Sequence, residues 1–304
     1  MMVCVLMSTY NGELYIKEQI DSILRQKDVD VKLIVRDDGS TDSTCDILNE
    51  YRDKGLLEWY TGENMKPARS FMHMLLNAPE CEYYSFADQD DIWYEDKLAA
   101  AVDAISREET ASPDSKVLYV CNKDIVDAEG RHLYHSEYKF RQAIGTAFME
   151  CYSSGCCMVM NAAMREYVSE HQPVKWQTLH DYWIYLLAHL VGKVIFDNTP
   201  HMGYRLHGNN ANGVGETGIM KKVKRLFANS GREAHASEIA QQLVQVCGAD
   251  VKAADQAVLA KVIKSKHSLG TRMQMLLSPD FALAGGDFKQ KVYAKLKILF
   301  NKLY

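Results

Sequence analysis

A repeated alternation of short apolar runs, polar turn clusters and amphipathic stretches occupies the first 125 residues of the chain. Such an alternation is typical of parallel βαβ units, in which each helix returns the chain to the same edge of a sheet. It therefore predicts an open α/β sheet. We expect strands at 3–7, 31–35, 57–60 and 83–87. Helices are expected at about 13–26, 43–51 and 68–77, and a further helix from about Tyr94. Ser40 or Thr41 would cap the second helix.

The remaining chain divides at the turn-rich segment 209–213. Before it we expect strands at 117–121, 156–160 and 193–196, and a helix over 181–190 that ends at Gly192. After it, the residues favour helices. We therefore expect an α/β domain over 1–215, made of halves 1–125 and 126–215, and a helical extension over 216–304.

Charge separates these two parts. Residues 1–215 carry 20 Lys and Arg against 33 Asp and Glu, a net charge of −13, whereas residues 216–304 carry 15 against 7, a net charge of +8. An acidic domain would repel the phosphate backbone of a nucleic acid, so no nucleic-acid partner is expected. No apolar run approaches the roughly 18 residues of a membrane span, and no basic segment precedes residues 1–7, so we expect a cytoplasmic protein. The eight cysteines show no C-x2-C spacing and are expected to be buried apolar residues.

Polar clusters follow the predicted strands at their carboxyl ends. These ends meet at one rim of a parallel sheet, where ligands bind. The loops contain neither G-x-G-x-x-G nor G-x-x-x-x-G-K-[ST], which argues against a dinucleotide fold and a P-loop. The clusters are Thr9-Tyr10-Asn11, Asp37-Asp38-Gly39-Ser40 and Asp88-Gln89-Asp90-Asp91.

Three carboxylates within residues 88–91 would repel one another unless they are solvated or bind a cation. Carboxylate oxygens are ligands of Mg²⁺ and Mn²⁺, and such an ion would allow an acidic rim to hold phosphates. Other interpretations remain open for single residues. Asp-Gly-Ser after a strand is also a common turn and helix cap, Asp181 is also a plausible partner of a helix dipole, and His207 is ambiguous in isolation.

Five motifs in order carry a family resemblance. Over about residues 1–210 the chain resembles the family 2 glycosyltransferases of the GT-A fold, in particular the bacterial polysaccharide rhamnosyltransferases. Residues 1–125 would then be the nucleotide-sugar half and 126–215 the acceptor half. The motifs are M-S-T-Y-N-G-E at 7–13 with E-Q-I-D-S-I at 18–23, V-R-D-D-G-S-T-D at 35–42, F-A-D-Q-D-D-I-W at 86–93, H-D-Y-W at 180–183 and Y-R-L-H-G-N-N at 204–210.

The resemblance implies a donor site. Asp88 and Asp90 resemble the D-x-D pair of these enzymes, with Asp90 on Mn²⁺ or Mg²⁺ and Asp88 nearer the ribose or a metal-bound water. Arg205 and His207 match a segment that closes over the diphosphate, where His207 would also reach the metal. The nucleoside, with a uracil or thymine base, would be held by Thr9, Tyr10, Asn11, Glu13, Asp37 and Asp38.

Other positions carry weaker implications. Asp181 matches the catalytic base, and Gly155, within the stretch 152–157, would allow close approach of the ligand. Arg69 or Lys66 would contact phosphate. Lys66 stands where this family usually has glycine, so the resemblance implies that the local backbone differs there.

The implied reaction is an inverting, metal-dependent transfer of a sugar to a hydroxyl of a glycan or lipid-linked acceptor in cell-surface polysaccharide synthesis. The resemblance favours rhamnose from dTDP-rhamnose. A UDP-hexose or UDP-N-acetylhexosamine transferase is the alternative, and so is a catalytically silent nucleotide-sugar-binding module.

The end of the chain, 288–304, predicts a basic amphipathic helix. A helix of this kind can lie on the inner face of an anionic membrane, or it can pack on the body of the protein or on a second subunit of a homo-oligomer. Its expected apolar face comprises Phe288, Val292, Leu296, Leu299, Phe300 and Leu303, among five lysines at 289, 291, 295, 297 and 302.

Overall fold

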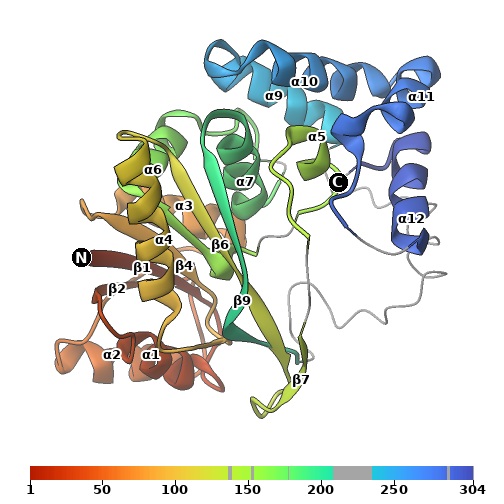
Figure 1. Cartoon of the computed structure of the whole chain (residues 1–304). Coiled ribbons are helices and arrows are strands. Elements are labelled where there is room, and N and C mark those ends of the chain that lie inside the picture. Colours follow the sequence, from red (N-terminus) through yellow and green to blue (C-terminus); the bar gives the residue numbers. More distant parts are fainter. Residues whose placement is uncertain (136–138, 152–153, 177, 208–234, 286–287, 304) are drawn as a thin grey trace.

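The computed structural model describes residues 1–135, 139–151, 154–176, 178–207, 235–285 and 288–303. A mixed sheet lies at the centre with helices on its faces, and the described helices of residues 236–299 form a cluster at one end (Figure 1). The predicted hinge at 209–213, the boundary near 215 and residues 152–153 lie outside the described residues.

The first four long strands form the expected parallel half-sheet. The order in this half is β3-β2-β1-β4, and every neighbouring pair is parallel. The elements are β1 (Met2–Thr9), α1 (Ile16–Leu24), β2 (Asp30–Asp37), α2 (Thr44–Asp53), β3 (Glu58–Thr61), α3 (Lys66–Asn77), β4 (Tyr83–Ala87), β5 (Ile92–Trp93) and α4 (Lys97–Ala111).

The second half of the sheet is mixed, and its strands continue the order as β8-β6-β9-β5. β8 is antiparallel to both β4 and β6, whereas β6 and β9 are parallel. The elements are β6 (Val117–Val126), β7 (His132–His135), α5 (Ile144–Ala147), the 3-10 turn η1 (Gly155–Cys157), β8 (Met158–Asn161), α6 (Ala162–Glu170), α7 (His180–Val191) and β9 (Lys193–Arg205).

Several sequence expectations need correction. The strand of 193–196 extends to Arg205 because β9 pairs with β6 along most of its length. The helix expected from about Tyr94 begins at Lys97, and the two residues before Tyr94, Ile92 and Trp93, form β5, which pairs with β9. Ser43 occupies the N-cap of α2, without a side-chain cap hydrogen bond, so neither Ser40 nor Thr41 caps that helix.

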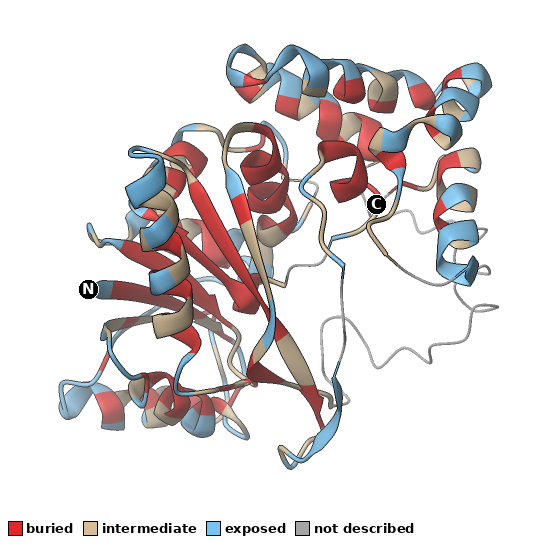
Figure 2. Ribbon diagram, in the orientation of Figure 1, coloured by how far each residue is buried: buried red, intermediate tan, exposed pale blue. Residues whose placement is uncertain are grey.

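The core lies between the sheet and its helices (Figure 2). Residues Val3 to Met7 of β1 are fully buried, as are most residues of β4. Strands buried on both faces read as continuous apolar runs rather than as alternating ones, which explains why these strands could be located from the sequence.

The helical extension comprises α9 (Ala236–Cys247), α10 (Ala253–Ser265), α11 (Leu269–Leu277), the turn η3 (Pro279–Phe281) and α12 (Phe288–Leu299). It contacts the α/β domain through α5. The Thr146 hydroxyl donates to the carbonyl of Ala282 at 3.0 Å, and Lys297 Nζ donates to the carbonyl of Met149 at 3.0 Å. On its other side, α5 packs against α7. The extension is therefore joined to the segment that precedes Gly155.

The expected apolar face of α12 is divided in the structure. Leu303 is buried, together with Ala294 and Ile298, so that side of the segment packs on the protein. Phe288, Val292 and Phe300 are exposed. Among the described residues, no helix is long and apolar enough to cross a bilayer.

Candidate functional site

The loops after β1 and β2 are bound to each other. Asn11 donates its backbone N–H to Ser40 Oγ at 2.8 Å, and its Oδ1 accepts from the backbone of Thr41 at 2.9 Å. Glu13 Oε2 accepts from the backbone of Ser43 at 2.9 Å. The polar groups of Asn11 and Glu13 thus fix the shape of this rim.

Gln89 connects this rim to the loop after β4. Its Oε1 accepts from Thr9 Oγ1 at 2.5 Å and from the backbone of Tyr10 at 2.9 Å. Tyr10 remains 48% exposed. The three loops that the sequence predicts to meet do meet, and Tyr10 presents an aromatic surface beside them.

Asp37 and Asp38 are both buried. Asp37 accepts from the backbone N–H groups of Gly39 and Ser40 at 3.0 and 2.9 Å. Asp38 forms an ion pair with Arg36 and accepts from Ser70 Oγ at 3.0 Å. Sequence reasoning missed Arg36, although a cation directly after an apolar run and before two carboxylates is a readable signal of a buried ion pair.

The backbone expectation for residue 66 is wrong. Lys66 has a φ of 65°, so the left-handed conformation that glycine would favour is kept despite the lysine side chain. Its N–H donates to Asn64 Oδ1 at 3.1 Å, which supports the turn. Lys66 and Arg69 are both exposed at the start of α3.

An acidic cluster follows β4. One ligand atom each of Asp88, Asp91 and Cys156 lies within 4.8 Å of the others. Burial, followed by the charges of Asp90 and Asp181, raises the pKa of Asp88 to about 7. Burial and the same kind of repulsion raise the pKa of Asp91 well above its usual range. These carboxyls are held close together at a cost in electrostatic energy.

Two lysines that sequence reasoning missed accompany this cluster. Lys97 is fully buried, donates to the carbonyl of Cys156 at 2.5 Å and lies 3.2 Å from the ring centroid of Trp93. Lys123 donates to Ser154 Oγ at 2.6 Å. Their partners come from distant segments, so the sequence gives no local signal of this arrangement. Their positive charges offset part of the repulsion among the acids.

Asp90 points to a different partner. His207 Nε2 lies 2.7 Å from Asp90 Oδ2. Arg205 supports this pair, because its Nε donates to the backbone carbonyl of Asp90 at 2.9 Å. The same guanidinium also donates to Glu18 and to the carbonyl of Ala128. The structure thus divides the predicted ligands into an Asp90–His207 pair and a group around Asp88, and Arg205 is buried among protein groups.

Asp181 lies in the first turn of α7. Its Oδ2 accepts from the backbone of Gly155 at 3.1 Å, and its Oδ1 lies 2.7 Å from the backbone N of Tyr182. His180 is buried, stacks on Phe71 at 4.5 Å, and has no hydrogen-bond partner for either ring nitrogen among the described residues. Asp181 and Gly155 are therefore brought together next to the acidic cluster.

The donor atoms fit a divalent cation. Buried carboxylates that repel one another and an adjacent imidazole offer oxygen and nitrogen ligands, and a cation would relieve the repulsion that raises the pKa of Asp88. Of the predicted ligands, Asp88 lies in a group with Asp91 and Cys156, and Asp90 pairs with His207.

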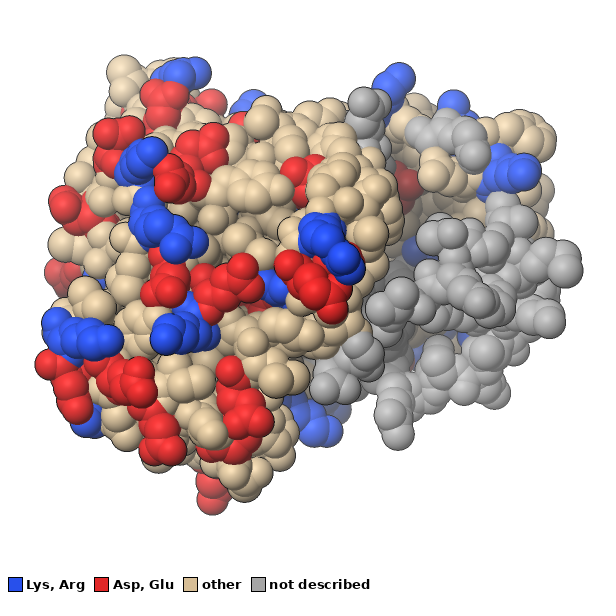
Figure 3. All heavy atoms as spheres, turned by 90° about the horizontal axis from the view of Figure 1, so that it is seen from below, with Lys and Arg blue, Asp and Glu red and all other residues tan. Residues whose placement is uncertain are grey.

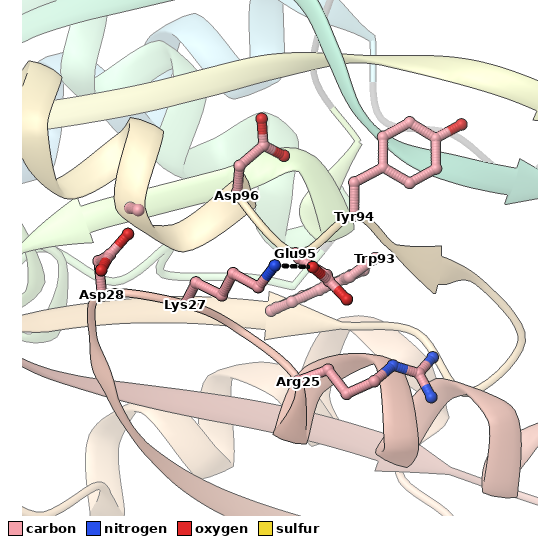
Figure 4. Close-up of a pocket in the computed structure, with 8 residues that line it drawn as sticks. Arg25, Lys27, Asp28, Trp93, Tyr94, Glu95 and Asp96 are labelled. Atoms are coloured by element: carbon pink, nitrogen blue, oxygen red, sulfur yellow. Dashed lines mark ion pairs between the residues drawn. The ribbon is translucent and has the colours of Figure 1, made fainter.

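A pocket of about 540 Å³ lies elsewhere, between the end of α1 and the start of α4 (Figure 4). It contains both charges, and Lys27 is ion-paired with Glu95 across it. None of the predicted site residues lines it, so we do not assign it to the donor. Its lining comprises Arg25, Lys27, Asp28, Trp93, Tyr94, Glu95, Asp96 and Ala99.

Charged side chains of both signs are mixed on the surface of the α/β domain. On the face seen from below, acidic and basic side chains are interspersed over the α/β domain, without a continuous basic patch on the described part of that face (Figure 3).

Curated proteins and solved structures resemble this chain. It is 30% identical over 239 residues to the dTDP-rhamnosyl transferase RfbG of Shigella flexneri, covering 72% of this chain and 78% of that protein. It is 35% identical over 99 residues to the putative teichuronic acid biosynthesis glycosyltransferase TuaG of Bacillus subtilis, covering 32% and 39%. The structure of S. aureus TarS with UDP-GlcNAc shares the fold, with a TM-score of 0.59 and 18% identity over 99% of this chain and 89% of that one.

The family model for glycosyl transferase family 2 matches residues 4–171, which contain the three joined loops, the acidic cluster and Gly155. The match covers more than half of the chain, and RfbG extends it at higher coverage. The protein is a glycosyltransferase with a GT-A fold, and it belongs to family 2.

Proposed function

We propose that this enzyme transfers rhamnose from dTDP-rhamnose to a hydroxyl of a glycan or lipid-linked acceptor, with inversion, in the synthesis of a cell-surface polysaccharide. The choice of donor is supported by similarity to RfbG, whose name gives a dTDP-rhamnosyl donor. The alternative donor is a UDP-hexose or a UDP-N-acetylhexosamine.

The observation that carries the proposal is the position of Asp181. The N–H of Gly155 donates to Asp181 Oδ2 at 3.1 Å and so orients the carboxylate of Asp181. The charge of Asp181 contributes to the raised pKa of Asp88. A carboxylate held in this way can take the proton of an acceptor hydroxyl as that oxygen attacks the anomeric carbon. We assign this role to Asp181.

The other side chains would bind the donor. Tyr10 presents its exposed ring beside the loops that Thr9, Asn11, Glu13, Asp37 and Asp38 shape, which supports a nucleoside site there. Arg69 is exposed at the start of α3 and is assigned to phosphate. Mn²⁺ or Mg²⁺, when bound, would neutralise charge on the leaving diphosphate. Arg205, which donates to the carbonyl of Asp90, would hold the Asp90–His207 pair in place.

We assign residues 1–215 to the transferase domain and 216–304 to the extension, and we propose that the extension contacts an anionic membrane. Leu269, Met273 and Leu277 are spaced four residues apart on α11 and are 60, 48 and 86% exposed. Phe288 and Val292 are exposed apolar residues of α12. This helix packs against α11 and carries exposed Lys289, Lys291 and Lys295. Apolar residues among lysines suit an anionic lipid surface.

Calorimetry tests the donor site. UDP, dTDP, GDP and CDP are titrated into the wild type and Asp90→Ala with and without Mn²⁺. We expect binding of dTDP that requires Mn²⁺ and is lost in Asp90→Ala. The absence of nucleotide binding by folded wild type would overturn the proposal, whereas binding of UDP alone would select the alternative donor. Transfer assays with dTDP-rhamnose and UDP-N-acetylglucosamine then identify the sugar.

A further inference from the structure

Two lysines from different elements hold the chain on either side of Gly155. Lys97, the first residue of α4, donates from Nζ to the backbone carbonyl of Cys156 at 2.5 Å. Lys123, on β6, donates from Nζ to Ser154 Oγ at 2.6 Å. Gly155 lies between these two contacts, so both of its chain neighbours are fixed from outside.

The segment depends on such outside contacts. η1 is a 3-10 turn of only three residues, and so short a turn has few internal hydrogen bonds. The N–H of Gly155 is directed at Asp181 Oδ2, at 3.1 Å. A shift of Ser154 or Cys156 would carry this N–H with it and turn the carboxylate. The direction of the carboxylate therefore depends on groups outside both η1 and α7.

Lys97 occupies its position at a cost. Its side chain is fully buried, and burial lowers the pKa of its ammonium group. Nζ lies 3.2 Å from the ring centroid of Trp93, so the face of the ring receives the charge. An apolar side chain of similar length, such as methionine, would fill the same volume without burying a charge. What the ammonium adds is its charge and its hydrogen bond to the carbonyl of Cys156.

We propose that Lys97 and Lys123 are positioning residues for the transfer reaction. They hold the segment 154–156 in place, so that Gly155 keeps the carboxylate of Asp181 directed at the acceptor hydroxyl. Neither lysine is assigned a contact with the substrate, and their role rests on the one proposed above for Asp181. Misplacement of a reacting group by about 1 Å can cost about 100-fold in rate, so loss of either contact should lower kcat.

Steady-state release of dTDP from dTDP-rhamnose by the full-length chain, with water as the acceptor, measures the effect. UDP-N-acetylglucosamine replaces this donor if calorimetry selects UDP. We expect Lys97→Met and Ser154→Ala each to lower kcat by about tenfold or more, while KM for the donor changes by less than about threefold. Circular dichroism establishes that each variant is folded.

The choice of variants separates hydrogen bonding from charge. Ser154→Ala removes the contact of Lys123 and keeps both lysines, so an effect of Lys97→Met alone would assign the lysines to charge compensation and overturn the proposal. Lys116→Met is the matched control and should keep full activity. Lys116 also lies over an aromatic ring, at 5.0 Å from the centroid of Tyr167, but this ring belongs to α6.

A double variant shows whether Lys97 acts through Asp181. If it does, Lys97→Met should lower kcat no further in a protein that already carries Asp181→Asn. An equal fall in both backgrounds would refute the positioning role even where Asp181 itself is required. Full turnover by folded Asp181→Asn would instead refute the role of Asp181, so the two failures are distinguishable.

Hydrogen exchange tests the same contacts without turnover. The amide of Gly155, assigned in ¹⁵N-glycine-labelled protein by its loss in Gly155→Ala, should exchange about tenfold faster or more in Lys97→Met and in Ser154→Ala. Gly203, in β9, should keep its exchange rate, which shows that the sheet is intact. Unchanged exchange at Gly155 in the folded variants would contradict the proposal, and Ser154→Ala alone decides if Lys97→Met does not fold.

Discussion

Gly155 and His180 are in direct contact: a Cβ atom on residue 155 would lie 2.6 Å from His180 Nε2. His180 is buried between Phe71 and Phe86 and cannot move aside easily. Because the N–H of Gly155 also holds Asp181, the shape of this small segment sets the direction of the carboxylate.

Gly155→Ala should therefore lower kcat by about tenfold or more, the effect of roughly 1–3 kcal/mol of steric strain placed on the Gly155–Asp181 contact. Steady-state transfer assays measure it, with KM for the donor little changed. Gly270→Ala is the control, because its nearest neighbour, Ser268 Oγ, would lie at an ordinary 3.8 Å. Equal activities of the two variants would show that the contact is unimportant.

Asp181→Asn should reduce transfer by about 10²–10⁴-fold while leaving calorimetric donor binding nearly unchanged, since the amide cannot accept the acceptor proton. Asp114→Asn is a suitable control, because Asp114 is an exposed residue with a φ of 64°, a conformation that asparagine tolerates. Full transfer by folded Asp181→Asn would remove this residue from catalysis.

Asp88 should make stability depend on pH. Its pKa is raised from 3.8 to about 7, so between these values the folded state holds a proton that the unfolded state has released. The stability contributed by this proton is present below pH 4 and is lost as pH rises toward 7. The free energy of unfolding of Asp88→Asn minus that of the wild type should therefore be about 1–3 kcal/mol larger at pH 8 than at pH 5. Denaturant unfolding in EDTA measures this gain, and an equal difference at both pH values would contradict the shift.

We expect substitution of Arg205 to lower stability and substitution of Arg69 to weaken nucleotide binding. Arg205→Gln removes bonds to Glu18 and to the carbonyls of Ala128 and Asp90, so it should cost about 2–4 kcal/mol of unfolding free energy. Arg69→Gln, at an exposed position, should leave stability unchanged and weaken nucleotide binding. Denaturant unfolding and calorimetry on both variants check this. A stable Arg205→Gln that binds dTDP poorly would instead place its guanidinium on the diphosphate.

The apolar surface of α11 should carry membrane affinity. The double variant Leu269→Ser, Leu277→Ser should reduce cosedimentation with phosphatidylglycerol vesicles by about tenfold or more, because each leucine contributes roughly 1.5 kcal/mol or more on burial. Leu14→Ser is the control, since Leu14 is 76% exposed but belongs to the α/β domain. No binding by the wild type would dispose of the membrane contact, and a concentration-dependent mass in light scattering would indicate a homo-oligomer.

The sequence located most accurately a strand that is buried on both faces of the sheet. The apolar run at 83–87 matches β4 residue for residue because that strand is covered on both faces. In contrast, β5 comprises only Ile92 and Trp93, and its partner β9 lies more than a hundred residues away. No local pattern specifies such a pairing.

The site was predictable in its loops but not in its internal partners. Loops at the carboxyl ends of β1, β2 and β4 had to meet, as the bonds from Gln89 to Thr9 and Tyr10 show. The placement of the Lys97 side chain against the backbone carbonyl of Cys156 joins two residues 59 positions apart. The left-handed Lys66 shows that a turn can persist when its usual glycine is absent, because neighbouring bonds maintain it.

The packing of α5 between α7 and the extension bears on how the enzyme can be shortened. Thr146 and Met149 are bonded to Ala282 and Lys297, and they lie within ten residues of Gly155. A protein that ends at residue 207 would expose α5 to water. It would also lose the hydrogen bonds that hold residues 146 and 149, close to the Gly155 that orients Asp181. We therefore expect a truncated form to lose activity because it has lost the support of α5 rather than a reactive group.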